Sequence, residues 1–329
     1  MTLPIKEHPT HIIYDSSKLK CFCDCPRQFF YQYILGWRLD IPNHDTYFGE
    51  SIHKSREYSL LHGYEDIQGA YLAFLNYYRK EFSPESDELY KPKNPVNAFN
   101  MITQFAESRM SDLEENEVVE LNGQKMLEIS GTVPIDEKRV LHYRMDSIMR
   151  RLSDGKIFSW DWKTTKRFSR QWREDFHLGI QNGTYTHCLY CMFPIEEVLG
   201  IEFYGICFEQ LTKGSKNRPA GYYVSFEQVP AFKTPEQMNV WLWNTIDILN
   251  NLEREMDRLY HCSEDDIVMM SFPMNPNSCT KYFGCAYHDF CLSWTNPLQR
   301  SYEIPIGFRE EFWNPSAMDT TVKKNLEWR

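Results

Sequence analysis

The sequence predicts an α/β fold, a central mixed sheet flanked by helices, with a helical part before it and a cysteine-bearing part after it. Runs rich in β-branched and aromatic residues gather in the middle of the chain, at residues 117–133, 139–163, 201–209 and 221–229. Helical periodicity dominates both flanks. With 329 residues, 42% hydrophobic and 25% charged, the chain is long and apolar enough for a substantial core.

No repeat, low-complexity tract or clear linker divides the chain. We therefore expect one domain over residues 1–329. Within it, residues 1–116 form a helical part, residues 117–230 an α/β core, and residues 231–329 a long helix followed by a cysteine-bearing segment.

The helices are expected at residues 18–34, 66–81, 95–115, 172–192 and 235–260, with another beginning near residue 47. Ser16 and Ser17 are candidate N-caps for the first helix. Pro26 interrupts that helix, so two short helices are an alternative.

A β-hairpin is predicted around Asp154-Gly155, because a two-residue turn needs positive φ and this dipeptide provides it. If these two residues form the loop, Ser153 faces Lys156. Continuing outward along the strands places Ile148 opposite Asp161 and Asp146 opposite Lys163.

Asp146, Asp161 and Lys163 then share one face of the hairpin, because side chains alternate along a strand. Trp160 and Trp162 flank Asp161, which indicates that this strand is buried on at least one side. Buried charges are rare unless they are paired or bind metal. A divalent cation between the two carboxylates would neutralise them.

The overall charge and the N-terminus limit the class of protein. A net charge of −10 argues against nucleic-acid binding through a generally basic surface, although a local basic track remains compatible with it. No segment resembles a membrane helix, and the first ten residues lack the apolar core of a signal peptide. We therefore expect a cytoplasmic protein whose ten cysteines are thiols or metal ligands.

Cys279, Cys285 and Cys291 form an evenly spaced triad in a loop-rich segment. A fourth thiolate could come from Cys21, Cys23 or Cys25, and four thiolates suit either zinc or an iron–sulfur cluster. The long spacing and the distant fourth ligand favour iron–sulfur. The remaining cysteines fall in helix or strand patterns and are expected to be buried thiols: Cys188, Cys191, Cys207 and Cys262.

Several short motifs occur together in an order that resembles one family, the RecB-like branch of the PD-(D/E)xK nucleases with a four-cysteine iron–sulfur cluster. This branch includes CRISPR-associated exonucleases, AddB-type recombination nucleases and phage homologues. The matching segments are Cys25-Pro26-Arg27-Gln28-Phe29-Phe30-Tyr31, Phe48-Gly49-x-x-Ile52-His53, Tyr143-Arg144-Met145-Asp146, Asp161-Trp162-Lys163-Thr164, Gln181-x-x-x-Tyr185, and the three late cysteines. Arg144 departs from the family pattern, as does the wide spacing between Cys279 and Cys285.

The resemblance implies a metal-dependent deoxyribonuclease. His53, Asp146, Asp161 and the carbonyl of Trp162 would hold Mg²⁺ or Mn²⁺, and Lys163 would position the attacking water or stabilise negative charge. The DNA substrate would be single-stranded or have free ends, processed by an exonuclease in recombination, repair or phage- and CRISPR-related pathways. The alternative is an inactive nucleic-acid-binding or inhibitor protein with the same fold.

The resemblance also assigns supporting roles. Gln181 and Tyr185 would contact substrate or orient Lys163. A [4Fe–4S] cluster would be bound by four cysteines: Cys25, Cys279, Cys285 and Cys291. Zinc is the alternative metal at that site, and a helicase or recombination protein is the implied partner.

Overall fold

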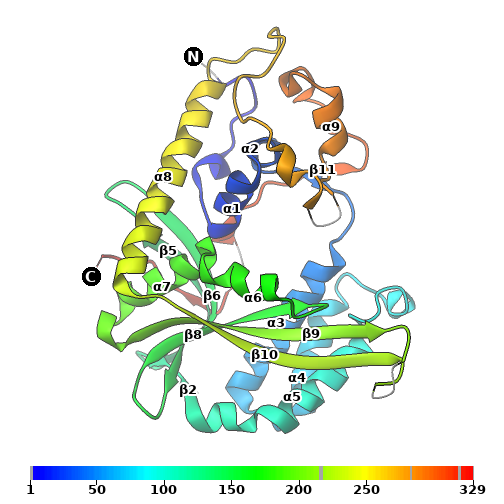
Figure 1. The fold of residues 1–329 in the computed structure, drawn as a ribbon, viewed down its shortest axis with the longest axis vertical. Helices are drawn as coiled ribbons and strands as arrows, with labels where there is room; N and C mark the ends of the chain where they lie inside the picture. The colour runs from blue at the N-terminus through cyan, green and yellow to red at the C-terminus, as the bar shows by residue number, and fades with distance from the viewer. Residues whose placement is uncertain (1–2, 215–217, 282–283, 318–319, 329) are drawn as a thin grey trace.

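The computed structural model describes residues 3–214, 218–281, 284–317 and 320–328. Its central feature is a five-stranded sheet in the order β10-β9-β8-β7-β2 (Figure 1). β8 and β9 are parallel and the other neighbours are antiparallel, so the predicted mixed sheet is confirmed. The strands are β2 (Asn116–Val118), β7 (Met149–Arg151), β8 (Ile157–Thr165), β9 (Val198–Leu211) and β10 (Gly221–Phe232).

A second sheet, in the order β12-β5-β6, adjoins the first. Its strands are β5 (Leu127–Pro134), β6 (Val140–Ser147) and β12 (Val322–Lys323). The chain passes from β6 directly into β7, so it crosses from one sheet to the other at Ile148. Near this crossing the Ser159 hydroxyl on β8 donates to the carbonyl of Ser147, at 2.6 Å. β6 therefore diverges from β8 just where Asp146 lies.

The predicted hairpin register is wrong by two residues. Arg151, and not Ser153, faces Lys156, because the Arg151 N–H donates to the Lys156 carbonyl at 2.9 Å. The loop is thus four residues long, and Asp154 uses its carboxylate to bind the side chain of Arg151. On this side of β8, β7 is the strand that pairs with it, with Met149 opposite Phe158, and β6 does not. A shift of two leaves each side chain on its predicted face but removes the expected pairing of Asp146 with Lys163.

Helices cover both faces of the main sheet. The helices are α1 (Ser16–Asp24), α2 (Pro26–Phe29), α3 (His44–His62), α4 (Ile67–Tyr78), α5 (Pro95–Glu115), α6 (Arg170–His177), α7 (Ile180–Met192), α8 (Pro235–Leu259) and α9 (His288–Ser293). In Figure 1, α3, α4 and α5 lie in the lower part with the main sheet, and α1, α2 and α9 lie in the upper part. α8 runs along one side of the upper part and ends near α7.

The two faces of β8 serve different cores. Trp160 and Trp162 are fully buried against α3 and α5, in a cluster that includes Phe105 and Tyr204. Side chains between them point to the other face, which α7 covers with Tyr185. The alternation follows strand geometry and places Asp161 under α7.

Two helix predictions need correction, and the predicted break at Pro26 is confirmed. Asp15, and not Ser16 or Ser17, caps α1, since its carboxylate accepts from the Lys18 N–H at 2.8 Å. Pro26 does end that helix, and a π-helical turn (Phe30–Ile34) follows α2. The single helix expected at 172–192 is two helices, α6 and α7, which separate at Gly179.

The two ends of the chain pack together. β1 (Trp37–Leu39) pairs with β11 (Phe308–Glu310), while β12 near the C-terminus pairs with β5. The remaining short strands, β3 (Glu120–Leu121) and β4 (Gln124–Lys125), form a separate pair. The Tyr287 hydroxyl donates to the Trp37 carbonyl at 2.6 Å. Among the helices described, none has the length and apolar character needed to cross a membrane.

The packing of α7 on α8 depends on Gly183. A Cβ at this position would lie 2.0 Å from Cδ1 of Trp241. The backbone of Gly183 therefore contacts the Trp241 ring directly, with no room for a methyl group between them. Alanine normally stabilises a helix relative to glycine. We expect Gly183→Ala to lower the free energy of unfolding by about 1–3 kcal/mol instead, because it overpacks this contact.

Thermal and urea unfolding measure this effect. In a Trp241→Leu background, Gly183→Ala should become neutral or stabilising, since the clashing ring is gone. The same penalty in both backgrounds would show that the close approach does not determine stability.

Candidate active site

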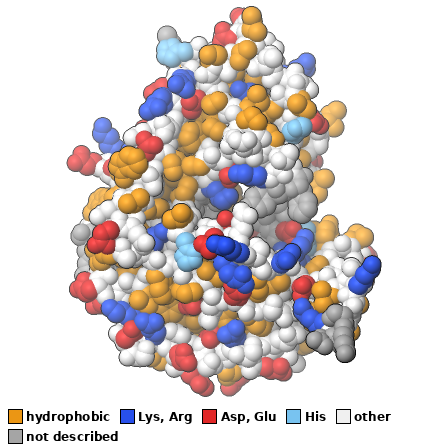
Figure 2. All heavy atoms as spheres, in the orientation of Figure 1, with side chains coloured by type: hydrophobic (Ala, Val, Ile, Leu, Met, Phe, Trp, Pro, Cys, Tyr) orange, Lys and Arg blue, Asp and Glu red, His pale blue; other side chains and the backbone are white. Residues whose placement is uncertain are grey.

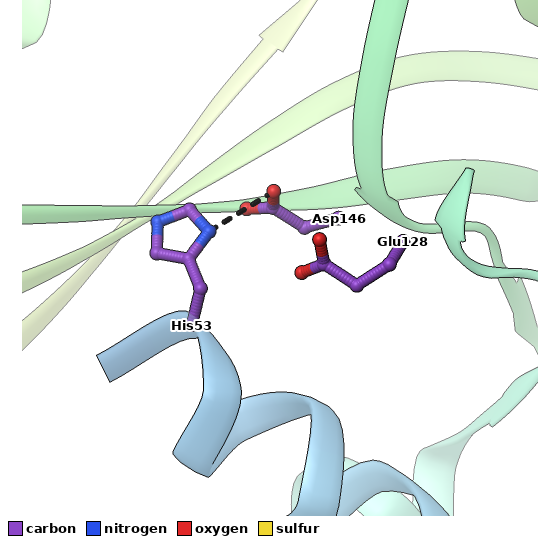
Figure 3. Close-up of side chains that lie close together, drawn as sticks. All are labelled: His53, Glu128 and Asp146. Carbon is purple, nitrogen blue, oxygen red and sulfur yellow. Dashed lines mark hydrogen bonds and ion pairs between the residues drawn. The ribbon is translucent and has the colours of Figure 1, made fainter. Parts of the chain in front are cut away.

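Asp146 lies near the end of β6, just before the chain crosses into the main sheet, and His53 approaches it from α3 (Figure 3). His53 Nδ1 lies 3.1 Å from Asp146 Oδ1, and His53 Nε2 lies 3.0 Å from the carbonyl oxygen of Trp162. The second oxygen of Asp146 accepts from the Trp162 N–H at 2.8 Å. One histidine and one carboxylate thus bind both polar groups of a single residue of β8.

The hydrogen bonds of His53 define its charge in this structure. A carbonyl and a carboxylate accept hydrogen bonds, so this geometry favours a hydrogen on both ring nitrogens. Burial lowers the pKa of His53, but the neighbouring Asp146 more than offsets this and raises the pKa above its ordinary value. The surroundings of His53 therefore stabilise its imidazolium form.

Glu128 completes a group of ligand-type side chains that the sequence reasoning missed. One ligand atom each from His53, Glu128 and Asp146 lies within 4.8 Å of the others, and no other such group of three occurs in the described residues (Figure 3). Glu128 is only 1% exposed and has a φ of +45°, in the left-handed region that is uncommon for a residue of this kind. Arg144 donates to its carboxylate at 2.7 Å and 3.1 Å.

A pattern in the sequence could have identified Glu128. It is an acidic residue between Leu127 and Ile129, both of which are buried in β5. β5 runs antiparallel to β6 with Ile129 opposite Met145, so Glu128 lies at the level of Asp146. A charged residue inside an apolar strand next to the strand of another acid is a candidate ligand.

Asp161 and Lys163 extend from β8 on the face that α7 covers. Lys163 Nζ lies 2.5 Å from Asp161 Oδ2, although no well-directed hydrogen bond reaches that oxygen. Asp161 is 2% exposed, and burial raises its pKa to about 6 even though Lys163 opposes the shift. Asp161 does not belong to the group formed by His53, Glu128 and Asp146.

The site contains three buried carboxylates and few cations. Burial and the nearby Asp146 raise the pKa of Glu128. Burial also acts to raise the pKa of Asp146, but His53 outweighs it and the pKa lies below its ordinary value. Three carboxylates therefore share Arg144, Lys163 and a histidine that is charged only when protonated. A divalent cation fits this donor set, because carboxylate, imidazole and carbonyl groups are ligands that Mg²⁺ and Mn²⁺ accept.

Gln181 and Tyr185 reach the same region from α7. Gln181 Nε2 donates to the Tyr185 hydroxyl at 2.9 Å. Burial, together with the charges of Asp161 and Asp146, raises the pKa of Tyr185 well above its ordinary value. The phenol thus stays protonated near two carboxylates.

The structure also brings the N-terminal and late cysteines close together. Cys25 is buried at the junction of α1 and α2, and its sulfur accepts from the Asn275 N–H at 3.4 Å. Burial raises the pKa of Cys291 to about 11, and Cys25, Cys285 and Cys279 raise it as well, with Arg27 opposing. No three of these sulfurs in the described part of the chain lie within 4.8 Å of one another.

The other two N-terminal cysteines differ in position. Cys21 lies one turn before Cys25 and is an electrostatic neighbour of Cys25 and Cys285. Cys23 is exposed, and the charges that act on its thiol come from Asp24 and Lys20 instead. None of the other cysteines is among them.

Comparison with known proteins agrees with this geometry. No curated protein matches the chain. The model of the PD-(D/E)XK nuclease superfamily matches residues 16–292. This stretch begins with α1 and includes β6 with Asp146, β8 and the late cysteines. Members of this superfamily are typically metal-dependent nucleases. The chain therefore belongs to the PD-(D/E)XK nuclease superfamily.

Proposed function

We propose that the protein is a Mg²⁺- or Mn²⁺-dependent deoxyribonuclease that acts as an exonuclease on single-stranded DNA or DNA ends. The observation that carries this proposal is the close group of His53, Glu128 and Asp146, with Asp161 and Lys163 of β8 as charged neighbours of Asp146. Burying these carboxylates without a counter-charge is costly. We infer a role in recombination, repair or phage- and CRISPR-related DNA processing, with a helicase or recombination protein as partner.

His53, Asp146, Asp161 and the Trp162 carbonyl would hold the ion, and Glu128 is a further candidate ligand. The ring nitrogens of His53 lie within hydrogen-bond distance of two of these oxygens, Asp146 Oδ1 and Trp162 O. Binding a cation there requires His53 to lose a proton. When bound, the ion lowers the pKa of a coordinated water and stabilises charge on the scissile phosphate.

Lys163 supplies the positive charge that belongs to the protein itself. Its ammonium group is held at Asp161 and is 29% exposed, so it faces both the carboxylate and solvent. From this position it can donate to a phosphate oxygen or to the attacking water. Gln181 and Tyr185 form a neutral hydrogen-bonded pair near it that can orient these groups.

We further propose that Cys25, Cys279, Cys285 and Cys291 bind a [4Fe–4S] cluster. Their electrostatic proximity supports a shared site. Because no three of these sulfurs in the described residues lie within 4.8 Å of one another, several irons suit them better than one zinc ion, whose Zn–S bonds are about 2.3 Å. Cys25 is a better candidate than Cys23, which is exposed. A bond from each end of the chain to one cluster would close nearly the whole chain into a loop.

The nuclease proposal is tested at Asp161 and Lys163. Asp161→Asn or Lys163→Met should reduce metal-dependent cleavage of end-labelled DNA by about 100-fold or more, because each removes a ligand or a donor at the reacting phosphate. Lys156→Met, just before the start of the same strand, is the matched control and should retain activity. Wild-type cleavage by folded Asp161→Asn or Lys163→Met protein would reject the assignment.

The choice of metal ion provides a second test. Activity with Mn²⁺ should at least equal activity with Mg²⁺, and His53→Ala should be as impaired as Asp146→Asn, since a nitrogen ligand suits Mn²⁺. A fully active His53→Ala protein would remove this residue from the site.

Protons should compete with the metal. Asp161, with a pKa of about 6, and His53, with a raised pKa, are protonated at pH 5.5 and largely lose these protons when metal binds. We therefore expect Mn²⁺ to raise the melting temperature clearly at pH 7.5 and much less at pH 5.5. An equal shift at both pH values would contradict this ligand set.

The cluster proposal predicts a coloured protein. Anaerobically purified material should be brown, with broad absorbance near roughly 400 nm and bound iron. Cys285→Ser should bleach the colour and lower the melting temperature, whereas Cys23→Ser, the matched control, should change neither. Zinc without iron would overturn the cluster type, and protein without bound metal would leave these cysteines as thiols.

A further inference from the structure

A cavity of about 450 Å³ opens directly beside Lys163. β8 and β9 form its floor, and the rest of its lining comes from α6, the start of α7 and the first turn of α1. Gln181 also lines it, so the cavity adjoins the residues assigned to the metal-dependent chemistry. Its position means that any group held in it lies next to the reacting phosphate.

One wall of the cavity is aromatic. Phe176 stacks on Phe203 with ring centres 4.2 Å apart, and Trp172 packs edge-on against Phe176 at 4.8 Å. Lys163 Nζ lies 5.8 Å from the centre of the Phe203 ring. The wall thus runs from α6 down to the proposed catalytic lysine.

Gly205 lets the indole ring of Trp172 pack closely against β9. A Cβ at Gly205 would lie 2.4 Å from Cη2 of Trp172, so a side chain there would displace the ring. No residue of α6 is fully buried, and Trp172 and Phe176 keep part of their surface exposed although both are large apolar side chains. α6 therefore presents aromatic surface to a cavity that the chain itself does not fill.

The groups around this wall suit a nucleotide. Lys163, which is paired with Asp161, and Lys20, which is paired with Asp24, both line the cavity, so it contains two ammonium groups of the kind that contact phosphates. Gln181 and the rim residue Asp175 offer hydrogen-bonding groups to the edge of a base. In Figure 2, lysine and arginine side chains gather across the middle of the view, where Figure 1 places α6.

A larger cavity adjoins this one. Ser17 and Lys20 line both this cavity and a cavity of about 930 Å³ between α1, the start of α3 and the C-terminal segment. Two residues of α1 thus lie between the cavity beside Lys163 and the larger one.

We propose that this cavity binds one unpaired nucleobase of the DNA strand being cut, stacked against Trp172 and Phe176, next to the scissile phosphate. The proposal rests on the nuclease function proposed above and specifies the substrate. A base inside a duplex is already stacked and paired, so it must leave the helix to enter. Aromatic side chains hold unpaired bases in this way without selecting a sequence. The enzyme thus requires an unpaired nucleotide at the cleavage point.

Binding in EDTA tests the cavity without any cleavage. Fluorescence anisotropy should show wild-type protein binding a 12-mer of thymidine about tenfold more tightly than an abasic strand of the same length, since a stacked base contributes about 1–3 kcal/mol. Trp172→Leu should lose most of this preference, and Trp172→Phe should keep it. Trp243→Leu, which changes a tryptophan that is 68% exposed on α8, is the matched control and should behave as wild type.

Equal wild-type affinity for the two strands would overturn the proposal, and this comparison needs no variant to fold. A preference that survives in folded Trp172→Leu protein would also overturn it. The outcome is separate from that of the nuclease proposal. If the protein binds bases through Trp172 but never cleaves DNA, the cavity assignment stands and the nuclease activity is rejected. If it cleaves DNA but shows no preference for a strand with bases, the nuclease activity stands and the cavity assignment is rejected.

Discussion

The divergence of β6 from β8 at Asp146 is the constraint on which the site depends. If the two strands stayed paired, backbone hydrogen bonds would fill the space that the Asp146 carboxylate now occupies. Instead that carboxylate binds the Trp162 N–H directly, and His53 binds the Trp162 carbonyl. The side chains thus satisfy backbone groups of β8, and the same groups create a concentrated negative site that a cation can occupy.

The core behind this site keeps α3 in place. Arg56, one turn after His53, is 2% exposed, and its guanidinium lies 4.3 Å from the centre of the Phe105 ring and 5.9 Å from that of Trp162. Burial lowers the pKa of Arg56 to about 10. Contacts of a cation with aromatic faces offset part of the cost of burying it. The residue that presents its carbonyl to His53 is therefore also held from behind by the helix that carries His53.

Much of the fold could be predicted from the sequence because periodicity is a local signal. The strand pair β9 and β10, helix α5 and helix α8 all follow their apolar patterns. The register of the hairpin could not be predicted, because an Asp-Gly dipeptide fits a four-residue loop as well as a two-residue one, and the choice depends on Arg151 binding Asp154. The divergence of β6 involves a second sheet that only tertiary contacts create.

In the candidate site, too, residues in local motifs could be predicted and residues brought together by tertiary contacts could not. Short motifs in the sequence contain four of the candidate residues, which could therefore be predicted: His53, Asp146, Asp161 and Lys163. Glu128 stands in no motif, and its approach to Asp146 depends on the pairing of β5 with β6 and on an unusual φ. The aromatic wall of the cavity could not be predicted from the sequence either. Trp172 and Phe203 come from distant segments, which approach each other where Gly205 allows close packing.

The central claim is that the buried carboxylates of β6 and β8 form a metal site for DNA hydrolysis. The most direct measurement is cleavage of end-labelled single-stranded and double-stranded DNA by anaerobically purified protein in Mg²⁺, Mn²⁺ or EDTA. We predict stepwise shortening of the single strand from an end with either metal and none in EDTA. Cleavage that persists in EDTA, or none with either metal in intact folded protein, would contradict the account.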